Sequence, residues 1–282
     1  MSPPRAPGWL IFIADSNLYI ALAGTLFVSA TFWMYGLSPD YYLSGFVFAA
    51  TLFTYNFQRQ VGMTFGDKSG QKSKVVMMLI GATASLVLVL FLDWLSIALL
   101  FFSGLLSIAY ALPFFRFREK KTALRQLPFA KIWIILIVWL LSGGIVPRLQ
   151  WSGPAGFDEG LSLFFLLFQQ GTFIFGLTLF FDVRDLAVDE PSQKTIPMIF
   201  GIDGTVKIAR IAFSLSFLAV FGNYFLGYFS PGVVLVHLST ILLCRFLLRK
   251  LTTDKPELFF TLLVDGMMVV QGVGMGLVYI YG

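Results

Sequence analysis

The stretch LSLFFLLFQQGTFIFGLTLFFDVRDLAVDEPSQKTIPMIFG, residues 161–201, joins an apolar run long enough to cross a membrane to three carboxylates. Asp182, Asp185 and Asp189 are three and four residues apart, a spacing that puts side chains on one face of a helix. Carboxylates held together repel one another unless a cation or hydrogen-bond donors lie among them. Because Mg²⁺ that carries phosphate oxygens prefers carboxylate ligands, the stretch indicates a metal–diphosphate site at a membrane boundary. The alternative is an ordinary charged helix end in water.

The composition is that of an integral membrane protein. Of the 282 residues, 57% are hydrophobic and 12% are charged, and the mean hydropathy is +0.83. The apolar runs are continuous rather than alternating, which predicts helices instead of membrane strands. At about 20 residues per crossing, they predict one domain over residues 1–282, an all-α bundle of nine transmembrane helices at about 10–34, 41–58, 75–92, 94–113, 128–147, 161–181, 205–227, 231–248 and 257–280.

The basic residues divide unevenly between the two sides of the membrane. Of the 20 Lys and Arg, all except Arg148 fall at the N-terminus or near the loops after the second, fourth, sixth and eighth spans. The positive-inside rule then places the N-terminus and these loops in the cytoplasm of a multi-pass protein, which we expect in a bacterial inner membrane. The net charge of +5 follows from this topology and predicts no nucleic-acid partner. Cys244 is the only cysteine, so no disulfide forms within the chain.

The segment after Phe181 resembles the second aspartate motif of the UbiA-type intramembrane prenyltransferases. That motif is DxxxD at the end of the sixth span, then Lys-Thr, a proline and a glycine, and its matches are Asp185, Asp189, Lys194, Thr195, Pro197 and Gly201. The resemblance implies a helical bundle over a central cavity. It also implies that Asp185 and Asp189 bind the cofactor Mg²⁺ and that Lys194 covers the diphosphate. Asp182 is then suited to be a further ligand or the base that takes the acceptor's proton.

The end of the second span departs from the family, which has NDxxDxxxD there. Asn56 matches the Asn, but the three Asp positions hold Phe57, Gln60 and Thr64. Asn56 and Gln60 are one turn apart and could hydrogen-bond a phosphate. Arg59 could hold a diphosphate oxygen in place of a metal ion, or it could only anchor the helix at the lipid headgroups.

Three further residues are expected near the substrate. Tyr110 and Arg116 resemble the family segment in which a Tyr and a Pro precede a basic cluster, although topology explains most charges of this loop. Asn17, in the first span, matches an Asn that faces the cavity in family members. Asp265, inside the ninth span, should face the bundle interior and pair, because an ionised carboxylate costs about 2.5 kcal/mol or more in lipid.

These features predict an enzyme that transfers a prenyl group from an isoprenoid diphosphate to a lipophilic acceptor, apolar or aromatic, within membrane lipid. Mg²⁺ would stabilise charge on the leaving group. The degenerate first motif leaves open a non-catalytic protein of the same fold that binds a lipid or a protein partner. A small transporter is a third possibility, because Asp265 and His237 could carry protons.

Overall fold

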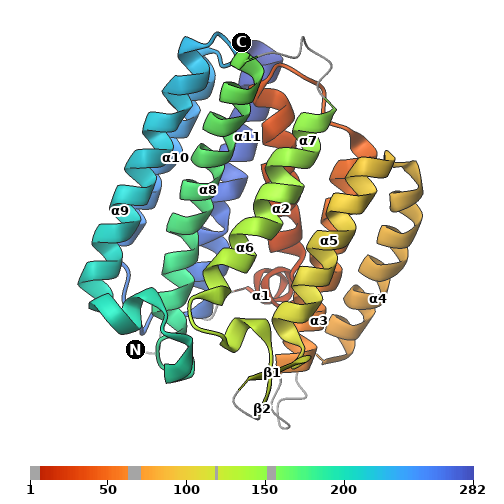
Figure 1. The fold of residues 1–282 in the computed structure, drawn as a ribbon, viewed down its shortest axis with the longest axis vertical. Coiled ribbons are helices and arrows are strands. Elements are labelled where there is room, and N and C mark those ends of the chain that lie inside the picture. Colours follow the sequence, from red (N-terminus) through yellow and green to blue (C-terminus); the bar gives the residue numbers. More distant parts are fainter. Residues whose placement is uncertain (1–6, 63–70, 118–119, 151–156) are drawn as a thin grey trace.

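The chain folds into a bundle of long helices with a small strand hairpin at one end. The computed structural model describes residues 7–62, 71–117, 120–150 and 157–282. Figure 1 shows the long helices side by side, with the C-terminus at one end and the hairpin at the other, which we call the hairpin end. The α-helices are α1 (Gly8–Asp15), α2 (Leu18–Met34), α3 (Tyr41–Gly62), α4 (Gln71–Leu88), α5 (Trp94–Ala111), α6 (Ala130–Leu140), α7 (Val146–Leu149), α8 (Phe157–Asp185), α9 (Ile196–Phe225), α10 (Pro231–Leu248) and α11 (Gly266–Tyr281).

The hairpin pairs β1 (Phe115–Phe117) with β2 (Lys120–Thr122) in antiparallel register. The sequence pattern did not predict it, because the continuous apolar runs indicate helices only within the membrane-spanning segments. The hairpin lies in the basic loop between α5 and α6, outside those runs, so the all-α class of the bundle is unaffected.

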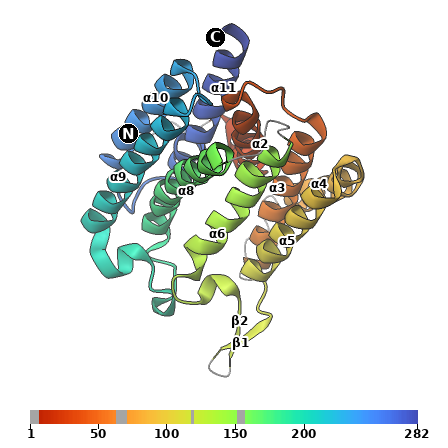
Figure 2. The same cartoon turned by 45° about the horizontal axis from the view of Figure 1, so that its top comes forward.

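Seven helices in the described ranges are long and apolar enough to cross a membrane, and the bent pair α1–α2 would make an eighth. Helix α3 is not among them, because its last turns carry Asn56, Gln58, Arg59 and Gln60. It packs against α2 and α4, as Figure 2 shows, so part of its surface is shielded. The all-α membrane bundle is therefore confirmed, whereas the count of nine spans stays a prediction.

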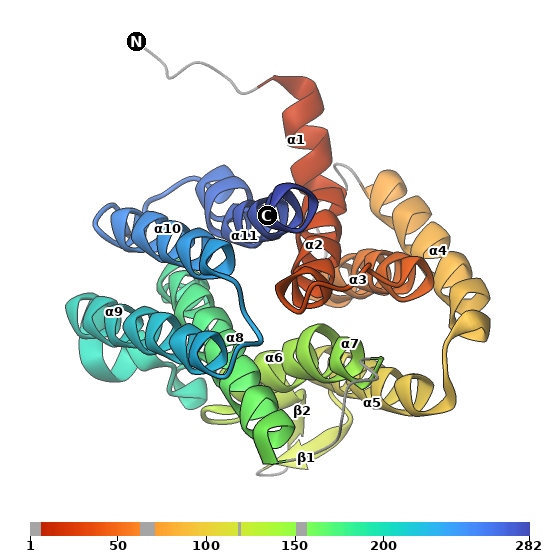
Figure 3. The same ribbon diagram turned by 90° about the horizontal axis from the view of Figure 1, so that it is seen from above.

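The first predicted span, residues 10–34, is broken, so the expectation of one continuous helix was wrong. Helices α1 and α2 meet at 63°, and Asn17 between them has a left-handed backbone with φ of 62°. Figure 3 shows α1 running outward from the bundle. The side chains of Trp9, Ile11 and Phe12 on α1 are exposed, which suits a helix lying at the membrane surface.

The fifth predicted span is composite: α6, the π-helical turn η3 (Leu141–Ile145) and α7 follow one another. Pro147 has no N–H to donate to the carbonyl of Gly143, four residues earlier. That carbonyl instead accepts a hydrogen bond from Thr31 Oγ1 of α2 at 2.6 Å, and Gln170 of α8 donates to the same hydroxyl at 2.8 Å. The irregular turn thus ties this span to α2 and α8.

The turn between α4 and α5 is short. Helix α4 continues as the 3₁₀ turn η1 (Val89–Phe91), and Asp93 caps α5 by accepting a hydrogen bond from the Ser96 N–H at 2.9 Å. Partial desolvation raises the pKa of Asp93, but hydrogen bonds from Ser96 outweigh it and hold that pKa below its usual range. Leu90 and Trp94 beside this turn are exposed, as side chains in contact with lipid or its interface would be.

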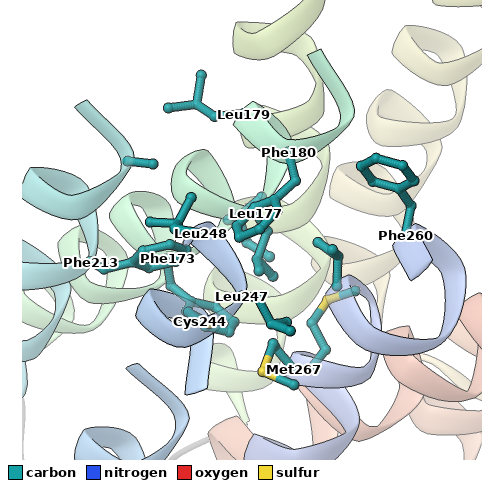
Figure 4. Close-up of a cluster of buried hydrophobic side chains, with 14 of the residues drawn as sticks. Phe173, Leu177, Leu179, Phe180, Phe213, Cys244, Leu247, Leu248, Phe260 and Met267 are labelled. Atoms are coloured by element: carbon teal, nitrogen blue, oxygen red, sulfur yellow. The ribbon is translucent and has the colours of Figure 1, made fainter. Parts of the chain in front are cut away.

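The largest apolar core among the described residues joins α8, α9, α10 and α11 and reaches α2 and α6. Figure 4 shows Phe173, Leu177 and Phe180 of α8 grouped with Cys244 and Leu247 of α10. The core continues along α8 to the last turns of that helix. Packing of these apolar side chains therefore fixes the end of α8, where the three carboxylates lie.

Candidate active site

The end of α8 positions the three carboxylates. Asp182 and Asp185 lie in its last turn, and the helix ends at Asp185. The chain keeps turning, because the N–H groups of Val188 and Asp189 donate to the Asp185 carbonyl at 2.9 and 2.8 Å. Asp189 is thereby brought to the other two carboxylates, although it lies beyond the helix, contrary to the prediction.

Lys131, in the first turn of α6, lies among all three carboxylates. Its Nζ is 3.1 Å from Asp182 Oδ1, 3.2 Å from Asp185 Oδ2 and 3.0 Å from Asp189 Oδ2. The Lys131 side chain is 11% exposed and that of Asp182 only 3%. Charges so buried are costly without partners, and the ammonium supplies the cation that three adjacent carboxylates require.

The backbone before α6 directs Lys131 toward α8. Phe129 has a left-handed conformation, with φ of 60°, and its N–H donates to the Gln193 carbonyl at 3.0 Å. That bond fastens the start of α6 to the loop that follows Asp189. Figure 1 shows the start of α6 and the end of α8 together at the hairpin end.

A second cation, Arg184, contacts Asp185 from another side. Its Nε is 2.7 Å from Asp185 Oδ1 and its Nη2 is 3.3 Å from Oδ2, a two-point contact. The guanidinium also lies 5.0 Å from the ring centroid of Phe181 and 5.5 Å from that of Phe260, within the range of cation–π attraction. Phe260 belongs to the π-helical turn η5 (Phe259–Val264), so Arg184 joins α8 to the segment that leads into α11.

The donor set suits a hard divalent cation, but an ammonium fills the place. Three carboxylate oxygens surround one point, and Mg²⁺ prefers ligands of this kind, but these oxygens stand 3.0–3.2 Å from that point, farther than the length of about 2.1 Å of a Mg²⁺–oxygen bond. That point is Lys131 Nζ. In the described part of the chain, no three Asp, Glu, His or Cys side chains are arranged to hold a metal ion. The ammonium is therefore a stand-in cation among ligands that are chemically suited to magnesium.

Asn17 and Asn56, both predicted near the substrate, lie together and hydrogen-bond to each other. Asn56 is fully buried, and its Oδ1 accepts from Asn17 Nδ2 at 2.9 Å. Its own amide donates to the carbonyls of Ser16 and Leu52, at 3.0 and 2.8 Å. These bonds brace the break between α1 and α2. Thr64, the last position of the degenerate motif, lies outside the described residues.

Arg59, on α3, pairs with Glu257 rather than with an α8 carboxylate. Their Nη2 and Oε1 atoms are 3.0 Å apart, and both side chains are partly exposed. Asp265 lies within electrostatic range of both Arg59 and Arg184. The amide nitrogen of Gln60 is buried without a hydrogen-bond partner. Polar and charged groups thus extend from the end of α8 toward α3 and η5.

The remaining predicted residues fall on both sides of the carboxylates. Tyr110, near the end of α5, is within electrostatic range of Lys131. Lys194 and Asp189 line a hollow of about 630 Å³ beside the loop after α8. Arg116 lies in β1 of the hairpin. The structure therefore brings Tyr110 and Lys194 to the motif, while Arg116 belongs to a separate element.

His237 lies in a different group of buried polar residues. Its Nε2 is 3.0 Å from Ser216 Oγ, and its Nδ1 is 3.3 Å from the Gln169 amide nitrogen and 3.4 Å from that of Gln271. None of these side chains has any exposed surface. They come from α8, α9, α10 and α11, and such hydrogen bonds between helices stabilise membrane bundles.

Three charged residues of the site were not predicted to belong to it: Lys131, Arg184 and Glu257. Lys131 alone carries a signal, since a lysine at the start of an apolar run is costly unless an acid lies beside it. Arg184 and Glu257 resemble many other charges near the ends of the spans, and only the folded chain reveals their partners.

Fold and site together define a class, the multi-pass helical membrane proteins with an aspartate motif at one end of the bundle. The model of the UbiA prenyltransferase family matches residues 66–264, more than half of the chain, and the chain belongs to this family. The match begins beyond Thr64, so it includes no part of the degenerate first motif.

Solved structures of UbiA homologs have the same fold. The apo structure of a UbiA homolog from Aeropyrum pernix K1 has a TM-score of 0.64 at 10% identity, covering 93% of this chain and 98% of that one. A UbiA homolog from Archaeoglobus fulgidus bound to Cd²⁺ has a TM-score of 0.57 at 10% identity, covering 93% of this chain and 99% of that one. A structure described for digeranylgeranylglyceryl phosphate synthase in membranes has a TM-score of 0.55 at 14% identity, covering 94% of this chain and 99% of that one. No curated protein sequence matched the chain.

Proposed function

We propose that this protein transfers a prenyl group from an isoprenoid diphosphate to a lipophilic acceptor, apolar or aromatic, within the membrane. One observation carries the proposal: the three carboxylates of the aspartate motif converge at the end of α8, in contact with the basic side chains of Lys131 and Arg184. Membership of the UbiA prenyltransferase family supports this type of reaction. The structural neighbour named for digeranylgeranylglyceryl phosphate synthase in membranes supports a lipid substrate.

The reaction needs positive charge around the leaving diphosphate. The bond between the first prenyl carbon and the diphosphate oxygen breaks, and its electron pair stays on that oxygen. Lys131 and Arg184 contact the motif, and Lys194 lines the same hollow as Asp189. Positive charge at these places would stabilise a developing anion. Asp185 and Asp189, with Asp182, would hold Mg²⁺, which when bound neutralises charge on the diphosphate.

The allylic carbocation that remains needs an apolar surface with electron-rich faces. Tyr110, Phe181 and Phe260 offer aromatic rings next to the charged groups, and such rings stabilise cations. A carbon or oxygen of the acceptor bonds to the prenyl carbon, and the acceptor's proton passes to a base. Asp182, the most buried of the three carboxylates, is our candidate for that base or for a further metal ligand.

We also propose that the hairpin end faces the cytoplasm of a bacterium, with the protein in the inner membrane. The basic loop of β1 and β2 and the loop after α8 both lie at this end, as Figure 1 shows. Basic loops remain on the cytoplasmic side of a membrane. The charged site would then open to the compartment that supplies a water-soluble diphosphate.

Pyrophosphate release tests the reaction. Purified protein would be incubated with prenyl diphosphates of several lengths, with and without Mg²⁺. We expect Mg²⁺-dependent release that falls at least about tenfold in Asp185→Asn, equivalent to about 1.4 kcal/mol. Asp203→Asn is the matched control, because Asp203 is an exposed carboxylate on α9. Equal rates of pyrophosphate release in the two variants would refute the assignment of Asp185 to the active site.

A non-catalytic protein of the same fold is the second candidate. The observation that favours it is the first motif, where Phe57, Gln60 and Thr64 replace the acidic residues. Such a protein would bind a lipid or a protein partner and release no pyrophosphate. Binding of a prenyl diphosphate without turnover, at any chain length, would support this candidate over the enzyme.

A further inference from the structure

We propose that Lys131 competes with a divalent cation for Asp182, Asp185 and Asp189, and that it turns to the diphosphate when the ion takes the carboxylates. The first half of this inference concerns only the cation site of this chain. The second half rests on the proposed function. Lys131 would keep the carboxylates together while no metal is bound and would contact phosphate once metal is bound.

One point cannot hold both cations. Lys131 Nζ lies 3.0 to 3.2 Å from one oxygen of each carboxylate. Mg²⁺ takes its oxygen ligands at about 2.1 Å, so the three carboxylates would have to close in around an ion, and that ion would stand near the position of the ammonium nitrogen. Two positive charges so close together repel each other strongly. Coordination of the ion therefore requires the ammonium to leave.

The charges of the cluster favour this exchange before an anion binds. The three carboxylates, together with Lys131 and Arg184, leave one uncompensated negative charge. A divalent ion changes the same group to one positive charge. The first state repels a diphosphate and the second attracts it.

Of the two cations in the cluster, Lys131 is the one able to move. Arg184 makes a two-point contact with Asp185 and lies over the rings of Phe181 and Phe260. The ion pairs of Lys131 are made by a single ammonium at the end of a flexible four-carbon chain. A change of rotamer can carry that ammonium away from the carboxylates without moving α6.

Metal binding in the absence of substrate tests the competition. Electron paramagnetic resonance would follow Mn²⁺ binding to the purified protein. Lys131→Met keeps an unbranched side chain, one atom shorter, and removes its charge, and we expect it to bind Mn²⁺ at least about tenfold more tightly than wild type. Lys131→Arg keeps a cation, so its affinity for Mn²⁺ should stay near that of wild type. Adding Asp185→Asn to Lys131→Met should abolish the gain in Mn²⁺ affinity.

The controls separate this effect from a general loss of positive charge. Lys207→Met removes an exposed lysine on α9 and should leave Mn²⁺ binding unchanged. If Lys131→Met does not fold, Lys131→Ala gives the same comparison. A folded, neutral variant at position 131 that binds Mn²⁺ no more tightly than wild type would overturn the competition.

Inorganic pyrophosphate tests the second half. At saturating Mn²⁺ we expect Lys131→Met to bind pyrophosphate at least about fivefold more weakly, opposite to its effect on the metal. Replacing a residue that only supported the fold would weaken the binding of both Mn²⁺ and pyrophosphate. Unchanged pyrophosphate binding would overturn the move of Lys131 to the diphosphate. If wild type releases no pyrophosphate from any prenyl diphosphate, the proposed function fails, and the Mn²⁺ comparison still decides the competition.

Discussion

Replacing Lys131 with Met should lower the free energy of unfolding by about 3–5 kcal/mol, the range for removing one partner of a buried ion pair. The side chains of Lys131, Asp182 and Asp189 are only 11%, 3% and 13% exposed, so water replaces little of the lost ammonium. Asp185 keeps Arg184, so two carboxylates rather than three lose their cation. By contrast, Asp189→Asn leaves Lys131 with two partners and should cost about 1–3 kcal/mol.

Divalent ions should restore much of this loss. A ligand present at 100 times its Kd adds about 2.7 kcal/mol to the folded state, and we expect Mg²⁺ to do so for Lys131→Met and much less for wild type. Unfolding by denaturant in detergent micelles, followed by tryptophan fluorescence with and without Mg²⁺, measures both effects. A loss below about 1 kcal/mol, the value of an exposed pair, or an equal gain from Mg²⁺ in both proteins would refute the assignment of the ammonium as the cation of the cluster.

Other expectations concern the α3 side, the packing and the topology. Arg59→Ala should weaken pyrophosphate binding about tenfold, since a guanidinium holds phosphate at two points. Lys72 is exposed, and Lys72→Ala should leave pyrophosphate binding unchanged. Equal effects of the two substitutions would exclude Arg59 from the diphosphate site. Gly81→Ala should destabilise the bundle, because its Cβ would lie 2.7 Å from the Ala49 carbonyl oxygen, while Gly104→Ala meets nothing within 4 Å and should be tolerated. A stable Gly81→Ala protein would contradict the packing of α3 on α4. Single cysteines at positions 70, 120 and 192 should label from one side of the membrane and at position 154 from the other; a shared side would contradict the topology.

The helices could be predicted because each is a long apolar run, but their breaks could not. The left-handed backbone at Asn17 is one that Asn adopts more readily than most residues without being obliged to. Its polarity was therefore compatible with a position inside a continuous span. A second break lies at Gly201, which kinks α9 between its first turns, from Ile196, and the predicted span; its φ of 68° is one that glycine adopts without steric cost.

The carboxylates of the candidate site could be predicted, and their cation could not. Asp185 and Asp189 belong to one local motif, so their spacing alone brings them together. Lys131 reaches them from another helix, and Arg59 meets Glu257 across 198 residues of sequence. With 20 Lys and Arg in the chain, nothing local assigns a particular cation to a particular carboxylate. Only the packing of α6 on α8 makes that choice.

The two sides of the site balance their charges differently, and this bears on how many metal ions it can hold. On α3, Arg59 is matched by Glu257, and no carboxylate stands at the described positions of the first motif. At the end of α8, the described part of the chain pairs three carboxylates with two cations, Lys131 and Arg184, so one negative charge remains to attract a further cation. Two acidic motifs could supply charge for several Mg²⁺ ions, whereas this arrangement has charge for one. A diphosphate bound here would meet a metal ion on the α8 side and basic side chains, Arg59 and the released Lys131, around its other oxygens.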